Sequence, residues 1–121
     1  MVLHASIGAA WAIRNKGELL PLWRFKDEES ARESSEAIYQ KFREYRSDGD
    51  FVGMGVARKY LQMGWTRSLR YAKYKGGDKS RPREDLDPKK SSAAGVFRKK
   101  WRAAEDEEYL RLKDEHERRN E

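Results

Sequence analysis

Apolar residues recur at helical spacing in three stretches of the chain, separated by residues that end helices. The first stretch runs from about Glu28 to Arg46 and follows an i, i+3, i+4 pattern. Asp27 is a suitable N-cap for a helix there, and Gly49 suits the left-handed residue that follows a helix end. The pattern predicts a helix whose buried face consists of Ala31, Ser34, Ser35, Ile38, Phe42 and Tyr45.

The second stretch begins directly after Asp50, which can cap a helix starting at Phe51. Gly64 predicts an interruption, since glycine weakens a helix interior. We therefore expect one helix over about 51–63 and a second, kinked or following a tight turn, over about 65–75. The pair Gly76-Gly77 should end it. The expected buried residues are Phe51, Ala57, Tyr60 and Leu61, with Trp65 and Tyr71 partly in the core.

The third stretch follows a segment that contains two prolines and nine charges, residues 78–90. Such a composition predicts a charged loop, which we place at 78–91. One long helix should then run from about Ser92 to Arg119, with the segment 92–121 completing the domain. Its apolar stripe ends near Glu105, so its end should be a solvated, charged helix. The stripe consists of Ala94, Phe97, Trp101 and Ala104.

The N-terminal part of the chain has no clean period. Residues 1–17 are interpreted as an arm, and Glu18 to Lys26 as an extended strap because Pro21 disfavours helix before it. Together these elements predict an all-α protein: a small orthogonal bundle of three to four helices, with a helical core over 18–77. The strap should pack on that core through Leu22, Trp23 and Phe25.

Composition limits the size of the protein and its chemistry. With 121 residues, 37% of them hydrophobic and 40% charged, the chain has room for one domain with a small core. The absence of cysteine excludes disulfides and thiolate metal sites. His4 and His116 lie at opposite ends, so no zinc-binding spacing exists. We predict no catalytic residue, no metal and no cofactor.

Motifs typical of enzymes and membrane proteins are missing. Gly53-Met54-Gly55 lacks the third glycine of a dinucleotide fingerprint and the Gly-Lys-Ser/Thr of a P-loop. No apolar run approaches the roughly 18 residues of a membrane span. We therefore expect a non-enzymatic, cytoplasmic protein with no membrane contact. The nucleus or an organelle is the alternative. For an organelle the indication is that residues 1–17 contain no acidic side chain, as in transit peptides.

Positive charge is concentrated in the middle of the chain. Between Asp50 and Arg83 there are nine basic and two acidic residues, a net charge of +7, whereas the whole chain carries +6. Arginine and lysine neutralise phosphates, and interleaved aromatic residues stack on unpaired bases. This segment therefore predicts contact with DNA, RNA or another polyanion. The candidate binding residues are Lys59, Arg67, Arg70, Lys73, Lys75, Lys79, Arg81 and Arg83.

Three other interpretations of these features remain open. The charges can be ordinary solvated helix surface and the aromatic residues core. A helix-turn-helix centred on Gly64 fits poorly, because Tyr60 and Arg70 fall where a small and a buried aliphatic residue belong. The alternative function is a protein–protein adaptor or homodimer, in which the C-terminal helix docks a partner through Trp101 and Tyr109.

Several segments resemble a known family. The strings LLPLWRFK, ARESSEAIYQKF, DFVGMGVARKYLQMGWTRSLRYAKYKGG and KKWRAAEDEEYLRLK are similar to domain-of-unknown-function family 4385, over roughly residues 18–113. Asp27-Glu28 stands where members often have Thr-Pro, and residues 1–16 depart from the usual N-terminal extension. The resemblance implies one small domain and brings no catalytic residue with it.

Overall fold

The protein is all-helical over the part of the chain described by the computed structural model, residues 14–105 and 107–119, as the sequence predicts. The four long helices are α2 (Glu28–Ser47), α3 (Phe51–Lys73), α4 (Pro88–Ala103) and α5 (Glu107–Arg119). Short 3-10 helices lie at Leu20–Leu22 (η1) and Lys75–Gly77 (η2), and residues 14–19 are also helical. The prediction of an extended strap from Glu18 is therefore wrong as far as Leu22, because Pro21 fits the first turn of a helix.

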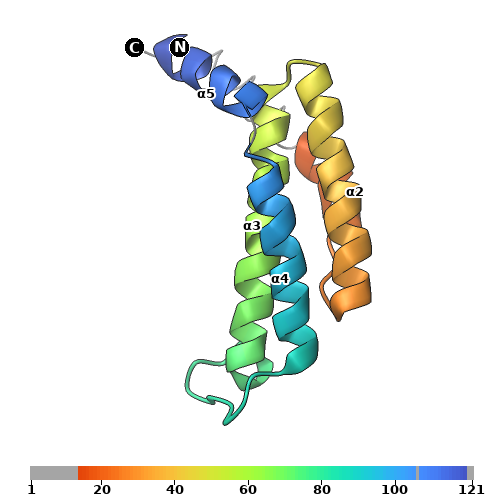
Figure 1. Ribbon diagram of the computed structural model, residues 1–121, viewed down its shortest axis with the longest axis vertical. Helices are drawn as coiled ribbons and strands as arrows, with labels where there is room; N and C mark the ends of the chain where they lie inside the picture. The colour runs from red at the N-terminus through yellow and green to blue at the C-terminus, as the bar shows by residue number, and fades with distance from the viewer. Residues whose placement is uncertain (1–13, 106, 120–121) are drawn as a thin grey trace.

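Helices α2, α3 and α4 lie side by side along the long axis of the molecule (Figure 1). Helix α3 is antiparallel to both neighbours, and α5 leaves the bundle at an angle, at the end where α2 joins α3. The orthogonal arrangement expected from the sequence is therefore wrong. Aligned packing lets each of α2, α3 and α4 bury one face against the other two.

Helix α3 continues through Gly64 without the expected break. A Cβ at this position would overlap the ring of Phe97 on α4. The glycine therefore serves the close approach of two helices and does not end one. The caps were predicted correctly: Asp27 accepts a hydrogen bond from Ser30 N, and Asp50 accepts one from Gly53 N, each at 2.8 Å.

The expected single C-terminal helix is two helices. Helix α4 begins at Pro88, earlier than predicted, because Asp87 caps it by accepting hydrogen bonds from the backbone of the first turn. The chain turns after Ala103, and Ala104 is fully buried. Because of this turn, the centroid of the Tyr109 ring lies 6.2 Å from that of Phe42 and 5.7 Å from that of Phe51. A straight continuation of α4 would place Tyr109 away from these two rings.

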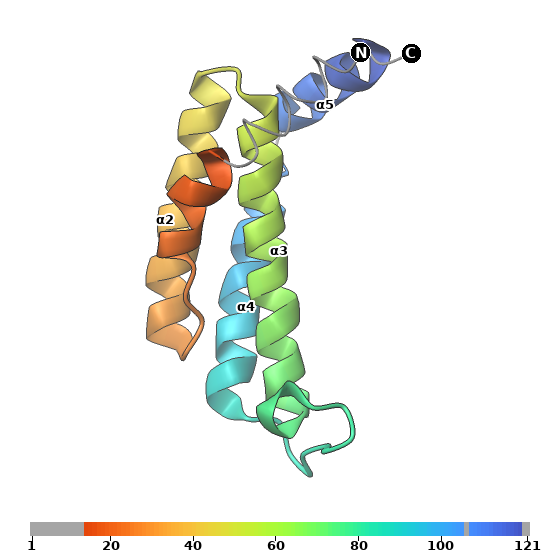
Figure 2. The same ribbon diagram turned by 180° about the vertical axis from the view of Figure 1, so that it is seen from behind.

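The core lies between α2, α3 and α4 and contains every residue predicted for the buried face of α2. The strap packs over the side of the core where α2 and α3 are neighbours, which faces the viewer in Figure 2. Trp23 packs on Tyr60 of α3 at 5.5 Å between ring centroids, and Arg24 N donates to Ser34 Oγ on α2. The strap residues Leu22, Trp23 and Phe25 are partly buried, as predicted.

The charged loop is shorter than expected and is tied to the end of α3. It runs over residues 78–87. Backbone hydrogen bonds join Lys75 N to Arg81 O and Arg83 N to Lys73 O, each at 2.9 Å, and Asp87 N to Ala72 O at 3.0 Å. These bonds fix the path of the loop against the helix. None of the helices in the described ranges is long and apolar enough to cross a membrane.

Candidate nucleic-acid interface

Four of the candidate residues lie on the solvent side of α3. Lys59, Arg67, Arg70 and Lys73 are all exposed. Because 100° separates successive residues of a helix, these positions form one drifting stripe about 21 Å long. From residue 51 to residue 77 the chain contains no Asp or Glu, so no acidic side chain of α3 interrupts the stripe.

Three more candidates extend this surface beyond the helix. Lys75, Lys79 and Arg81 are exposed on η2 and the loop. The hydrogen bond from Lys75 N to Arg81 O holds two of them side by side. None of the three forms an ion pair with a residue that the structure describes. We define the α3 basic face as Lys59, Arg67, Arg70, Lys73, Lys75, Lys79 and Arg81.

Arg83, the eighth candidate, is engaged inside the protein. Its Nε donates to the backbone oxygen of Tyr71 at 3.1 Å, and its Nη2 lies 3.8 Å from Asp87 Oδ2. The side chain is 30% exposed. Arg83 therefore anchors the loop, and the α3 basic face does not include it.

Three of the four aromatic residues interleaved with these charges pack against other rings, and the fourth, Tyr74, is half-buried. Tyr60 contacts Trp23, and the Tyr71 ring lies 6.1 Å from Phe25. Trp65 lies 5.3 Å from Trp101 of α4. The most exposed large hydrophobic side chains of the described ranges are Leu20, Leu86 and Leu110, none of them aromatic. The surface thus offers cations for phosphates and few rings on which bases could stack.

Helix α4 adds positive charge outside the segment 50–83 that was predicted to bind. It contains no acidic residue, so the segment 51–104 carries 15 basic and 4 acidic residues, a net charge of +11. Arg98 lies with its guanidinium 5.3 Å above the Trp65 ring, which places it at the seam between α4 and α3. The signal was present in the sequence, since the acid-free composition resumes directly after Asp87.

A small hollow lies where α3 meets η2. Its lining residues are Arg67, Arg70, Tyr71, Gly76 and Gly77, and its volume is about 260 Å³. The guanidinium of Arg67 lies 5.1 Å above the ring of Trp23, and Arg70 Nε donates to Gly77 O at 2.5 Å. The hollow brings together two of the predicted binding residues with both glycines of the predicted helix end.

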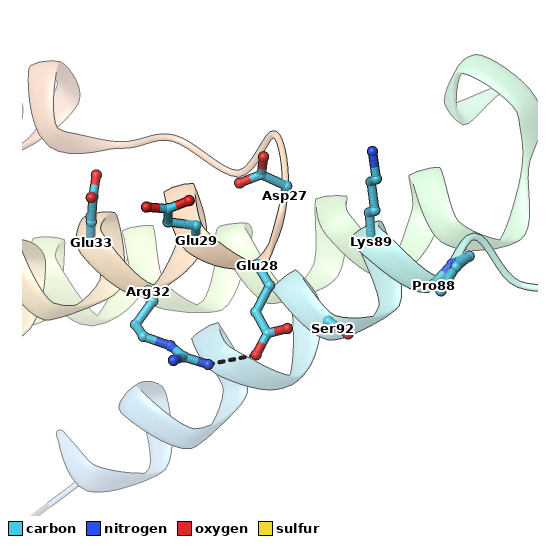
Figure 3. A pocket seen from close by; sticks show the side chains of 8 residues that line it. All are labelled: Asp27, Glu28, Glu29, Arg32, Glu33, Pro88, Lys89 and Ser92. Carbon is cyan, nitrogen blue, oxygen red and sulfur yellow. Dashed lines mark hydrogen bonds and ion pairs between the residues drawn. The ribbon is translucent and has the colours of Figure 1, made fainter.

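A larger groove, of about 810 Å³, lies between the first turns of α2 and α4 (Figure 3). Its lining is mainly acidic, with four carboxylates against Arg32 and Lys89. Arg32 is paired with Glu28, and the side chains of Glu33 and Lys89 point to solvent without converging. Among the described residues no cluster of three or more ligands could hold a metal ion. This groove would repel a polyanion.

The fold and the site define a small all-α protein built around an acid-poor, strongly basic helical hairpin. Residues 11–119 match the model of the family described as Domain of unknown function (DUF4385), so the chain belongs to that family. The match begins before the strap and includes α5, and so extends further than the resemblance over 18–113. No curated protein and no solved structure matches the chain significantly.

Proposed function

We propose that this protein binds nucleic acid through the α3 basic face and acts as a binding module without catalysis. One observation carries the proposal: seven exposed cations follow a helix and its adjoining loop, with no acidic residue between positions 51 and 77. Charge of one sign along a surface attracts a polyanion, and each phosphate neutralised releases a bound counterion.

The inward packing of the aromatic rings supports contact with the sugar–phosphate backbone. Single-strand binding usually needs rings on which successive bases stack, and each stacked base contributes about 1–3 kcal/mol. Tyr60, Trp65 and Tyr71 already pack against other rings of the protein. We therefore propose that the face favours double-stranded over single-stranded nucleic acid and does not read sequence.

Docking of a protein through the C-terminal part of the chain has less support. Trp101 packs on Trp65, and Tyr109 is 8% exposed. The Arg58 guanidinium lies between them, 5.4 Å from the Trp101 ring and 4.6 Å from the Tyr109 ring. The two aromatic side chains that a partner would need are thus largely used to hold α5 on the bundle.

Fluorescence anisotropy with labelled duplexes and single strands, titrated over salt, tests the proposal. We expect duplex binding that weakens linearly with log salt, with a slope of about −4 to −6 for five to six phosphate contacts. Single strands of equal length should bind more weakly. Absence of binding at about 50 mM salt, or affinity independent of salt, would contradict it.

A further inference from the structure

We propose that the hollow at the end of α3 is a binding site for a single phosphate group, held by Arg67 and Arg70 beside the side-chain-free backbone of Gly76 and Gly77. The proposal deepens the proposed function, on which it rests for the natural source of the phosphate. The site itself can be tested with inorganic phosphate alone.

Both guanidinium groups are positioned before any ligand arrives. Arg67 stacks 5.1 Å above the Trp23 ring, and Trp23 is itself held between Phe25, at 5.1 Å, and Tyr60. Arg70 is fixed through its Nε, which donates to Gly77 O. Arginine carries five N–H donors in a planar fork, so each side chain keeps terminal donors for a phosphate oxygen. Ordering them in advance reduces the entropic cost of binding.

No carboxylate of the described chain neutralises these two arginines by a direct ion pair. One carboxylate that competes for Arg70 is that of Asp78, which follows Gly77. Its carboxylate accepts hydrogen bonds from Ser80 N at 3.0 Å and Ser80 Oγ at 2.8 Å. These bonds hold the pKa of Asp78 below its ordinary value, and the charge of Arg70 contributes less. Asp78 is thus occupied by Ser80 and leaves Arg70 available to an anion.

The two glycines keep the rim of the hollow free of side chains. Both have left-handed backbone, with φ of 59° at Gly76 and 72° at Gly77, where other residues are strained. A Cβ at Gly77 would also lie 3.1 Å from the ring of Tyr71, which forms part of the lining. The Gly77 N–H donates to Tyr74 O, so the glycines leave space for an anion and the two guanidinium groups supply the donors.

NMR titration of the full chain with inorganic phosphate, at constant ionic strength, tests the site. The readouts are the Arg70 Nε–H signal and the amide signals of Gly76 and Gly77. We expect saturable shifts confined to this hollow. They should be lost in Arg67→Gln and retained in Arg43→Gln, which removes one exposed arginine of α2 outside the α3 basic face. Asp78→Asn keeps an acceptor for Ser80 but removes the competing charge, so it should tighten binding about two- to threefold.

Shifts that do not saturate, or that survive unchanged in Arg67→Gln, would overturn the proposal. The natural source of the phosphate is either the end of a strand or its interior, and duplexes with and without a terminal phosphate distinguish the two. Tighter binding of the phosphorylated duplex assigns the site to strand ends, and equal binding assigns it to internal phosphates. The two proposals also fail separately. A phosphate titration without saturable shifts, together with duplex binding that is lost in Lys59→Glu/Lys73→Glu, removes the phosphate site alone. Phosphate binding without duplex binding removes the proposed function alone.

Discussion

Single residues of this protein set how closely its helices approach. Gly53 and Gly64 both lie on the buried face of α3, where an added Cβ would meet Tyr45 in one case and Phe97 in the other. Gly55 lies on the same helix with nothing within 4 Å of such a Cβ. The same residue type thus has a packing role at two positions and none at the third.

Gly64→Ala should destabilise the protein by about 1–3 kcal/mol, because the methyl group forces α4 away from α3. Gly55→Ala is the matched control and should be neutral, or stabilising by about 0.5–1 kcal/mol, since alanine favours helix. Urea unfolding followed by circular dichroism measures both. Equal effects of the two substitutions would refute the close-approach role of Gly64.

Asp27 makes the stability of the protein depend on pH. The hydrogen bonds from the Ser30 backbone and side chain lower the pKa of its carboxyl from the ordinary value of 3.8. A carboxyl whose pKa is lower in the folded state stabilises the fold above 3.8, and this contribution is lost as pH falls through the folded value.

Asp27→Asn keeps an acceptor for Ser30 but cannot ionise, so it isolates this effect. We expect the variant to be less stable than the parent at pH 7, with the difference shrinking below about pH 4. Denaturant unfolding at a series of pH values provides the measurement. A difference that stays constant down to pH 2 would show that the charge of Asp27 does not contribute.

At the scale of elements, the strap connects the core of the protein with the α3 basic face. It runs alongside α2 and α3, and its Trp23 supports both the core residue Tyr60 and the candidate binding residue Arg67. The sequence predicted that this segment packs on the core, because Pro21 is followed by a cluster of large apolar side chains. It could not predict that a binding residue lies on top of one of them, since that contact joins residues 44 positions apart.

Trp23→Ala should destabilise the fold by about 2 kcal/mol, less than a fully buried tryptophan, and should release Arg67 from its fixed position. Leu20→Ala is the control from the same strap, because Leu20 is 48% exposed and should change stability by less than about 0.5 kcal/mol. Thermal unfolding of both variants tests this prediction. A Trp23→Ala protein as stable as the Leu20→Ala protein would contradict it.

Some helix boundaries can be predicted from local sequence patterns, and others cannot. Helix α2 was predicted almost to the residue, because its cap, its periodicity and the glycine at its end are all local signals. The division between α4 and α5 was missed because it depends on Tyr109 reaching Phe42 and Phe51, contacts that only the assembled bundle creates. The unbroken α3 depends in the same way on Phe97 facing Gly64.

At the scale of the whole molecule, charge is segregated. The α3–α4 hairpin carries +11 while the chain carries +6, so the remaining residues sum to −5. The sequence pointed to the α3 part of this surface. It did not show that α4 lies beside α3 or that Arg83 is held by Tyr71. Those facts follow from tertiary packing.

The double variant Lys59→Glu/Lys73→Glu measures most directly whether the α3 basic face binds nucleic acid. Its matched control is Arg43→Glu/Lys113→Glu, two exposed positions on α2 and α5, so both proteins fall from +6 to +2. In duplex titrations at about 100 mM salt, we expect at least about tenfold weaker binding for the first variant and at most about threefold for the control. Equal weakening would show that net charge alone matters, and unchanged binding in the first variant would contradict the assignment of the face.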